Sequence, residues 1–173
     1  MKLTPPEGTP SVRGLSIPED FYWVLRAPAA LAGMAYPSWP PVWAELRRLG
    51  LQHVVCLTND RFPYDPSPLN PLHAVRLTDL VGGLRPEDPG REKSFIRAAA
   101  SVTVSRLSAG EGVVVHCAAG TGRAGTVLGC VLRELGYPSF GVIRYLDDLN
   151  RARGRDGWPE SGWQASVVEE FGS

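Results

Sequence analysis

The segment 113–135 constrains the fold more than any other part of the chain. It begins with Val-Val-Val-His, continues through a short loop that contains Gly120 and Gly122, and then takes up a helical pattern over residues 122–135. A run that is apolar and β-branched throughout is typical of a strand buried on both faces, as in a parallel sheet. A buried strand that leads through such a loop into a helix predicts an α/β fold.

The rest of the chain continues this alternation. Strands are predicted at 21–25, 31–34, 53–57 and 73–77, and further helices at 39–49, 91–107, 140–153 and 161–171. The Pro-rich stretch 59–71 predicts a surface loop. We therefore expect a single α/β domain with a central, mostly parallel sheet of four or five strands flanked by helices. Residues 1–20, with several Pro and Gly, are expected to form a loosely ordered N-terminal arm ahead of a domain at 21–173.

Length and charge agree with one soluble domain. The chain has 173 residues, 43% of them hydrophobic, which is enough apolar material for one core. The 18 Lys and Arg balance 18 Asp and Glu, so the chain lacks the basic excess that nucleic-acid or anionic-membrane binding requires. Three cysteines are too few for a disulfide scaffold. The N-terminal residues lack the apolar stretch of a secretory signal, and the longest nearly apolar run, 27–36, is too short for a membrane span. We expect a cytoplasmic monomer without nucleic-acid or membrane partners.

The loop after the strand at 113–116 has the composition of an anion-binding site. It consists of Cys117, Ala118, Ala119, Gly120, Thr121, Gly122 and Arg123. Consecutive backbone N–H groups and a helix N-terminus surround one small concavity there, which binds a tetrahedral anion and stabilises a thiolate. Arg123 can hold two phosphate oxygens in its planar fork. A nucleotide-binding loop is excluded because the Gly-Lys-Ser/Thr ending is missing.

These residues suit one reaction. The thiolate of Cys117 attacks phosphorus, while backbone amides and Arg123 stabilise the charge on the equatorial oxygens. A phosphocysteine forms and water hydrolyses it, without a metal or another cofactor. The pairs His53/Cys56 and His116/Cys117 do not suit a metal ion either, because odd spacings in strands place side chains on opposite faces.

The run His116-Cys117-x-x-Gly120-x-x-Arg123 matches the His-Cys-x-x-Gly-x-x-Arg signature of cysteine-dependent protein tyrosine and dual-specificity phosphatases. The chain resembles the compact dual-specificity phosphatases over about 31–171 by its order of elements. This resemblance implies hydrolysis of phosphate monoesters on phosphoproteins, at phosphotyrosine, with phosphoserine and phosphothreonine left open. It also implies that His116 tunes the thiolate through backbone hydrogen bonds.

The resemblance further implies a general-acid aspartate at the end of the strand 73–77. Asp79 occupies that position, where it would protonate the leaving oxygen and then activate water. Asp88 is the alternative, since its loop can also fold over the site, and either residue can instead be a solvated carboxylate or a helix cap. Gln164 lies in the segment that bears the family's water-positioning glutamine, although it can equally be an exposed residue at the start of a helix.

One departure from the family pattern follows the arginine, where the family usually has Ser or Thr and this chain has Ala124. The missing hydroxyl would help the sulfur to leave, and its loss predicts a cost of about 1–3 kcal/mol in the hydrolysis step. The alternative to an enzyme is therefore a catalytically stalled phosphate-binding module. A thiol-based redox protein, which would not need Arg123, is the other alternative.

The two remaining cysteines have separate expectations. Cys56 ends the strand 53–57, and some relatives protect an oxidised catalytic thiol through a disulfide with a cysteine at that place. The resemblance therefore allows a Cys56–Cys117 disulfide, whereas the plain alternative for Cys56 is a small buried core residue. Cys130 falls inside the helix 122–135 and is expected in the core.

Overall fold

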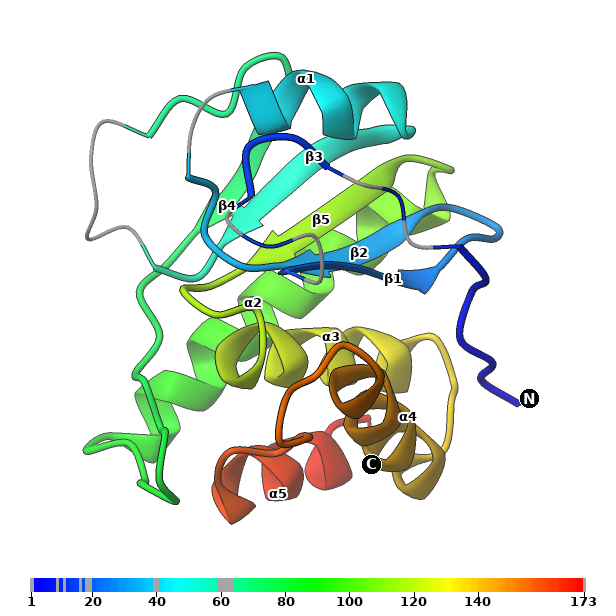
Figure 1. The fold of residues 1–173 in the computed structure, drawn as a ribbon. Helices are drawn as coiled ribbons and strands as arrows, with labels where there is room; N and C mark the ends of the chain where they lie inside the picture. Colours follow the sequence, from blue (N-terminus) through cyan, green and yellow to red (C-terminus); the bar gives the residue numbers. More distant parts are fainter. Residues whose placement is uncertain are drawn as a thin grey trace.

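The computed structural model describes residues 2–8, 10, 12–15, 17, 20–38, 41–58 and 64–172. Five strands form one sheet: β1 (Phe21–Leu25), β2 (Leu31–Met34), β3 (Leu51–Cys56), β4 (Asn70–Ala74) and β5 (Gly112–His116). Their order is β1-β2-β5-β3-β4, and only the β1–β2 pair is antiparallel (Figure 1). The predicted single α/β domain with a mostly parallel sheet is thus confirmed.

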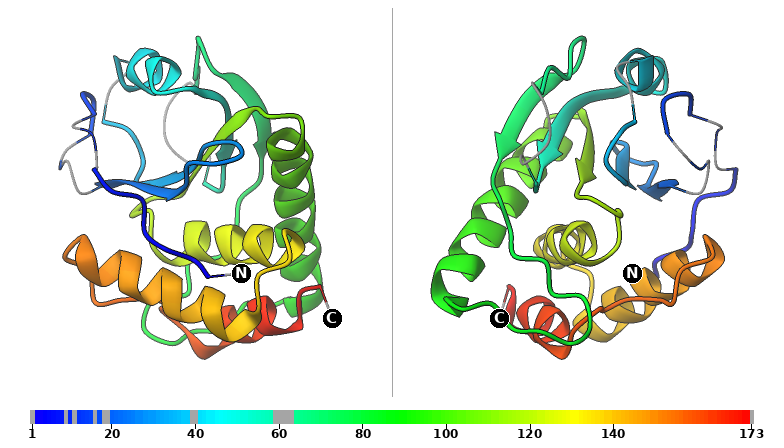
Figure 2. Two further views of the ribbon diagram at one scale, coloured as in Figure 1. Left: turned by 90° about the vertical axis from the view of Figure 1, so that its right-hand side faces the viewer. Right: turned by 60° about the vertical axis from the view of Figure 1, so that its left-hand side comes forward.

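Helices cover both faces of the sheet. The five helices are α1 (Pro41–Arg48), α2 (Pro89–Ser108), α3 (Gly122–Glu134), α4 (Ser139–Ala152) and α5 (Gly162–Glu170). Helix α1 lies on one face, and α2 and α3 lie on the other, with α4 and α5 packed outside α3 (Figures 1 and 2). The described helices include none with both the length and the apolar character of a membrane span.

Strand β5 is buried on both faces, which explains its uninterrupted apolar run. Val113 and Val115 belong to the core cluster on the side of α2 and α3, and Val114 belongs to the cluster on the side of α1. Cys117 continues the first of these alternations and is 2% exposed. Cys117 therefore lies at the carboxyl end of the sheet, directly after β5 and shortly before the start of α3.

The prediction for β4 is wrong by about three residues, since the strand was expected at 73–77. Pro71 was interpreted as part of a loop, but β4 is an edge strand, where a missing backbone N–H is tolerated. After β4 the chain stays beside β3, because Val75 N donates to Cys56 O (2.9 Å) and Leu77 N donates to Leu57 O (3.1 Å). This path still carries the chain to Asp79 at the carboxyl end of the sheet.

Two other expectations fall partly outside the described residues. The predicted loop 59–71 includes residues 59–63 and the predicted helix 39–49 includes residues 39–40, which the structure does not describe. Within the N-terminal arm, Val12 is buried in the core cluster on the side of α1. The boundary at residue 21 stays a prediction.

Candidate active site

The loop between Cys117 and Arg123 is held close to the end of β2. The backbone N–H of Tyr36 donates to Ala118 O at 2.9 Å. Gly120 has a φ of +75°, and a Cβ there would lie 2.6 Å from the carbonyl carbon of Met34. Glycine is therefore required at 120 both by the left-handed backbone and by this close approach.

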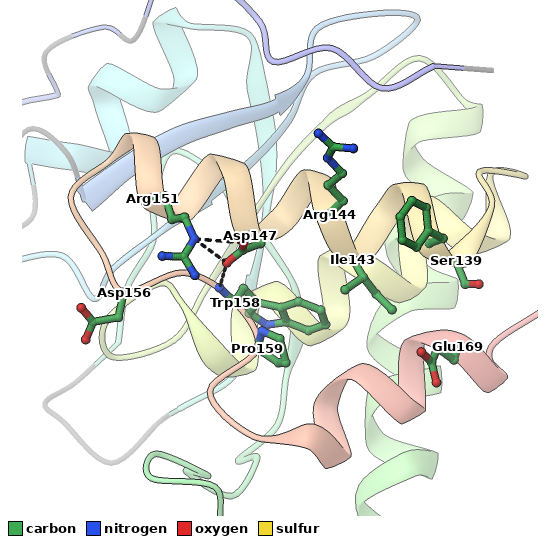
Figure 3. Close-up of a pocket in the computed structure, with 10 residues that line it drawn as sticks. Ser139, Ile143, Arg144, Asp147, Arg151, Asp156, Trp158, Pro159 and Glu169 are labelled. Carbon is green, nitrogen blue, oxygen red and sulfur yellow. Dashed lines mark hydrogen bonds and ion pairs between the residues drawn. The ribbon is translucent and has the colours of Figure 1, made fainter.

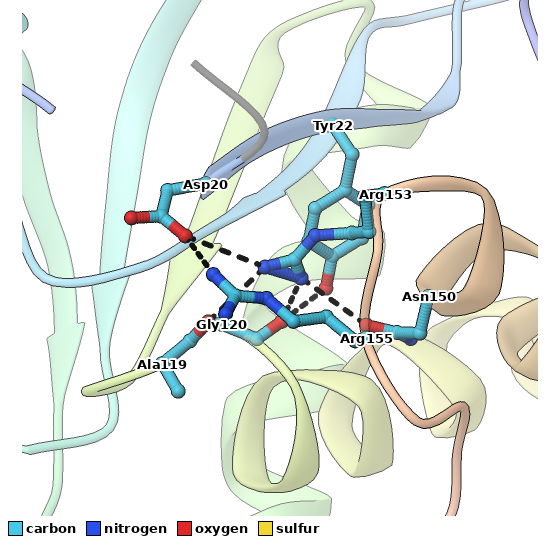
Figure 4. A network of polar contacts seen from close by, with 7 residues as sticks. All are labelled: Asp20, Tyr22, Ala119, Gly120, Asn150, Arg153 and Arg155. Carbon is cyan, nitrogen blue, oxygen red and sulfur yellow. Dashed lines mark hydrogen bonds and ion pairs between the residues drawn. The ribbon is translucent and has the colours of Figure 1, made fainter. Parts of the chain in front are cut away.

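A buried arginine donates hydrogen bonds to two carbonyl groups of the same loop, as Figure 4 shows. Arg153, which is 7% exposed, donates to Ala119 O (3.1 Å) and Gly120 O (3.4 Å). The hydroxyl of Tyr22 also donates to Gly120 O (2.6 Å). Because these donors engage the outward-facing carbonyls, they favour the loop conformation in which the amides face the concavity. The sequence analysis missed both residues.

One acid, Asp20, lies beside the two arginines Arg153 and Arg155. Asp20 lies 3.9 Å from Arg153 and pairs with Arg155 (Figure 4). Burial lowers the pKa of Arg153, whereas Tyr22, Asp20 and Cys117 act in the opposite direction. The guanidinium of Arg153 therefore interacts electrostatically with Cys117.

His116 lies at the end of β5 and is fully buried. Its Nδ1–H donates to the carbonyl of Cys117 (3.3 Å), and its Nε2 accepts from the hydroxyl of Tyr64 (2.7 Å). Burial lowers the pKa of His116 to about 4, so the imidazole is neutral at physiological pH. The imidazole of His116 is therefore a neutral group held by two hydrogen bonds. One of these bonds fixes the backbone of Cys117.

A cavity of about 640 Å³ opens beside the loop and brings both candidate acids together with Arg123. It is lined by Thr58, Arg76, Leu77, Thr78, Asp79, Glu87, Asp88, Arg91, Glu92, Phe95, Ala118 and Arg123. Asp79 Oδ2 lies 3.5 Å from Arg123 Nη2, and the aspartate side chain is 57% exposed. Asp88 is instead the N-cap of α2, where its Oδ1 accepts from Arg91 N (3.0 Å). Asp79 thus lies against Arg123, whereas Asp88 caps α2, and the role of either as the acid stays a prediction.

Gln164 is buried rather than exposed at the start of α5, which removes the alternative of a solvated position. Its Oε1 accepts from the backbone N–H groups of Glu160 (2.9 Å) and Ser161 (3.2 Å). Its Nε2 lies on the side of Gly122, where a Cβ would be 2.9 Å from it. The structure therefore brings Gln164 to the loop.

The family model described as "Swiss Army Knife protein, DSP-PTPase phosphatase domain" matches residues 18–142 of the chain. The chain belongs to this phosphatase family.

Solved structures show the same fold for this phosphatase domain. The human tyrosine phosphatase-like serine/threonine/tyrosine-interacting protein matches with a TM-score of 0.62 at 16% identity, over 82% of this chain and 89% of that chain. Human DUSP28 matches with a TM-score of 0.59 at 19% identity, over 86% and 93% respectively. Tk-PTP in its active form matches with a TM-score of 0.58 at 22% identity, over 83% and 90%. The resemblance to compact dual-specificity phosphatases is confirmed.

The residue directly after Arg123 in the phosphatase domain is Ala124, which has no hydroxyl. It lies in the first turn of α3 and is fully buried. The nearby hydroxyl of Thr126 donates to Gly122 O at 2.8 Å. Thr126 is thus engaged with the backbone of its own helix and does not replace the missing donor.

All three cysteines of the phosphatase domain are free thiols and buried. Cys56 is paired in register with His116 on the neighbouring strand, and its Sγ donates to Thr58 O at 2.7 Å. Burial raises the pKa of Cys130 strongly, in agreement with its expected core position. A Cys56–Cys117 disulfide stays a prediction.

A second cavity of about 690 Å³ lies between α4, α5 and the segment that joins them (Figure 3). Asp147 lines this cavity and connects two other lining residues, since it accepts a hydrogen bond from Trp158 N (3.0 Å) and pairs with Arg151 (3.0 Å). The described residues that line it include none from the loop 117–123, which carries the phosphatase signature and is called the signature loop below. The cavity beside Arg123 is therefore the candidate active site of the phosphatase domain.

Proposed function

We propose that this phosphatase domain hydrolyses phosphate monoesters on phosphoproteins through a phosphocysteine intermediate at Cys117. The observation that carries the proposal is the pairing of Arg123 with Asp79 at 3.5 Å across the mouth of the cavity that the signature loop borders. It supports a site in which a cation and an acid from different elements converge beside the signature loop.

The reaction proceeds in two steps. The backbone amides of Ala118 to Arg123 and the guanidinium of Arg123 hold the phosphoryl oxygens, and the Cys117 thiolate attacks phosphorus. Asp79, which is exposed at the cavity mouth, protonates the leaving oxygen. Water then cleaves the S–P bond, with Gln164 positioning that water and a carboxylate accepting its proton.

The cavity lining supports a phosphoprotein substrate rather than a headgroup with several phosphates. Both arginines and acids line it, and the loop positions Ala118, Ala119 and Thr121 are uncharged. A ligand with many phosphates would require a predominantly basic lining. Phe95 also lines the cavity and offers an aromatic surface for the ring of a phosphotyrosine.

The test is hydrolysis of 4-nitrophenyl phosphate and of a phosphotyrosine peptide by the purified chain. We expect activity that survives EDTA and is abolished in Cys117→Ser. Activity that is unchanged in Cys117→Ser would overturn the proposal, as would a requirement for a metal ion.

Ala124 favours one second candidate, a phosphate-binding module that stalls after phosphoryl transfer. Burst kinetics separate the two functions. Release of one equivalent of 4-nitrophenol per chain without further turnover identifies the stalled module, whereas steady turnover after the burst identifies the enzyme.

A further inference from the structure

A second carboxylate lies against the signature loop and has no role in the mechanism so far. Glu160 is partly buried in the segment before α5, and its Oε2 rests on Gly122 so closely that a Cβ there would overlap it. Gly122 is thus required to admit this carboxylate to the N-terminus of α3. The backbone O of Glu160 also accepts from Gly83 N (3.2 Å), which ties the residue to the loop that follows Asp79.

The charges that face Glu160 come from both neighbouring elements. Burial raises its pKa most, the negative charge of Asp79 raises it further, and Arg123 of α3 lowers it. Asp79 and Glu160 therefore both interact electrostatically with Arg123, in environments that differ: Asp79 is exposed and lines the cavity, whereas Glu160 is partly buried against Gly122. Paired carboxylates in unequal environments divide acid and base work between them.

Gln164 completes the arrangement. Its Oε1 is occupied by Glu160 N and Ser161 N, which orients the amide so that Nε2 lies on the side of Gly122. Glu160 Oε2 and Gln164 Nε2 thus approach the same point above Gly122. A water between them would accept a hydrogen bond from the amide and donate one to the carboxylate, so the carboxylate would be placed to take a proton from that water.

We propose that Glu160 is the general base of phosphocysteine hydrolysis and that Asp79 serves as the acid of the first step alone. The water oxygen forms the new bond to phosphorus, the S–P bond breaks with its electron pair returning to Cys117, and the water proton passes to Glu160 and then to solvent. This assignment rests on the proposed phosphatase function and divides two roles that the sequence analysis gave to one aspartate.

The test is a rapid-quench comparison of wild type, E160Q and D79N with 4-nitrophenyl phosphate and phenyl phosphate, with the phosphocysteine quantified by mass spectrometry. E160Q is expected to form the phosphoenzyme within about threefold of the wild-type rate and to hydrolyse it about 100-fold more slowly or worse. D79N is expected to slow phosphoenzyme formation from phenyl phosphate, the poorer leaving group, without accumulating the intermediate. The rising limb of the pH profile for phosphoenzyme breakdown should be present in wild type and absent in E160Q.

Glu134→Gln is the matched control, because Glu134 is an exposed glutamate at the end of α3 opposite to Gly122. It should leave both steps unchanged. E160D, which keeps the carboxylate on a shorter stem, should recover part of the hydrolysis rate, and thermal unfolding shows whether each variant is folded.

Two results overturn the assignment. If wild type turns over and E160Q hydrolyses its phosphoenzyme at the same rate, or if D79N alone accumulates the intermediate, the base is not Glu160 while the phosphatase function stands. If wild type shows neither a burst nor turnover that depends on Cys117, the phosphatase function itself fails and the assignment fails with it.

Discussion

The guanidinium of Arg153 lies 4.5 Å from the centre of the Tyr22 ring, and both side chains donate hydrogen bonds to Gly120 O. Strand β1 and the C-terminal end of α4 are thereby joined to the signature loop by two buried donors. Together these donors hold the carbonyl of Gly120 in place.

This relationship predicts that Arg153→Lys weakens oxyanion binding. Lysine lacks the planar fork that reaches Ala119 O and Gly120 O together, so the loop loses preorganisation. We expect about a tenfold increase in the Kd for vanadate, equivalent to about 1.4 kcal/mol. Protection of Cys117 from alkylation by vanadate measures it.

Arg151→Lys is the control for this prediction. Arg151 lies two residues away, is 61% exposed and pairs with Asp147 on the surface of α4. Exposed pairs of this kind contribute little. An equal loss of vanadate affinity in the two variants would show that Arg153 does not act through the loop.

Ala124→Ser should restore the donor that the family pattern supplies. The serine hydroxyl would reach toward the sulfur that leaves during hydrolysis, and a recovered hydrogen bond of about 1–3 kcal/mol corresponds to about 5- to 150-fold faster breakdown of the phosphoenzyme. Single-turnover decay of the phosphocysteine measures this rate. An unchanged decay in a variant with wild-type thermal stability would mean that another group already assists the sulfur.

The neutral state of His116 predicts a specific dependence of stability on pH. Its pKa is about 4 in the folded chain against 6.5 ordinarily, because burial penalises the charged form. The unfolded chain therefore binds a proton between these values that the folded chain does not, and stability falls as pH falls through 6.5 toward 4. Between pH 7.5 and 5 this effect amounts to about 2 kcal/mol.

His116→Gln keeps hydrogen-bonding groups toward Tyr64 and Cys117 but does not titrate. Urea denaturation at several pH values should show a shallower loss of stability below pH 6.5 in this variant than in wild type. Parallel pH profiles in the two proteins would contradict a buried neutral imidazole.

The sequence predicted those parts of the site that are contiguous in the chain. Residues 113–123 form a strand and a loop whose apolar run and glycines carry their own structural signal. Tyr22 and Arg153 could not be assigned from the same sequence, because they meet Gly120 across 98 and 33 residues respectively. An arginine near a helix end is usually solvated, and no local pattern distinguishes the one that is buried.

The error in β4 has the same origin. A proline excludes a residue from a central strand but not from an edge strand, and only the order of the sheet reveals which strand lies at the edge. Glu160 likewise gains its significance only from its approach to Gly122 and Gln164.

Replacing the two aspartates of the cavity should have opposite effects on activity and stability. Asp79 contacts Arg123 and has no part in a helix, so Asp79→Asn should reduce kcat for a phosphotyrosine peptide by about 100-fold or more with little change in stability. Asp88 caps α2, so Asp88→Ala should lower the free energy of unfolding by about 1 kcal/mol and leave kcat nearly unchanged. Peptide hydrolysis and urea denaturation of both variants measure the two effects. A large loss of kcat in Asp88→Ala with normal activity in Asp79→Asn would reverse the assignment, because it would place the proton donor on the loop before α2 rather than on the loop after β4.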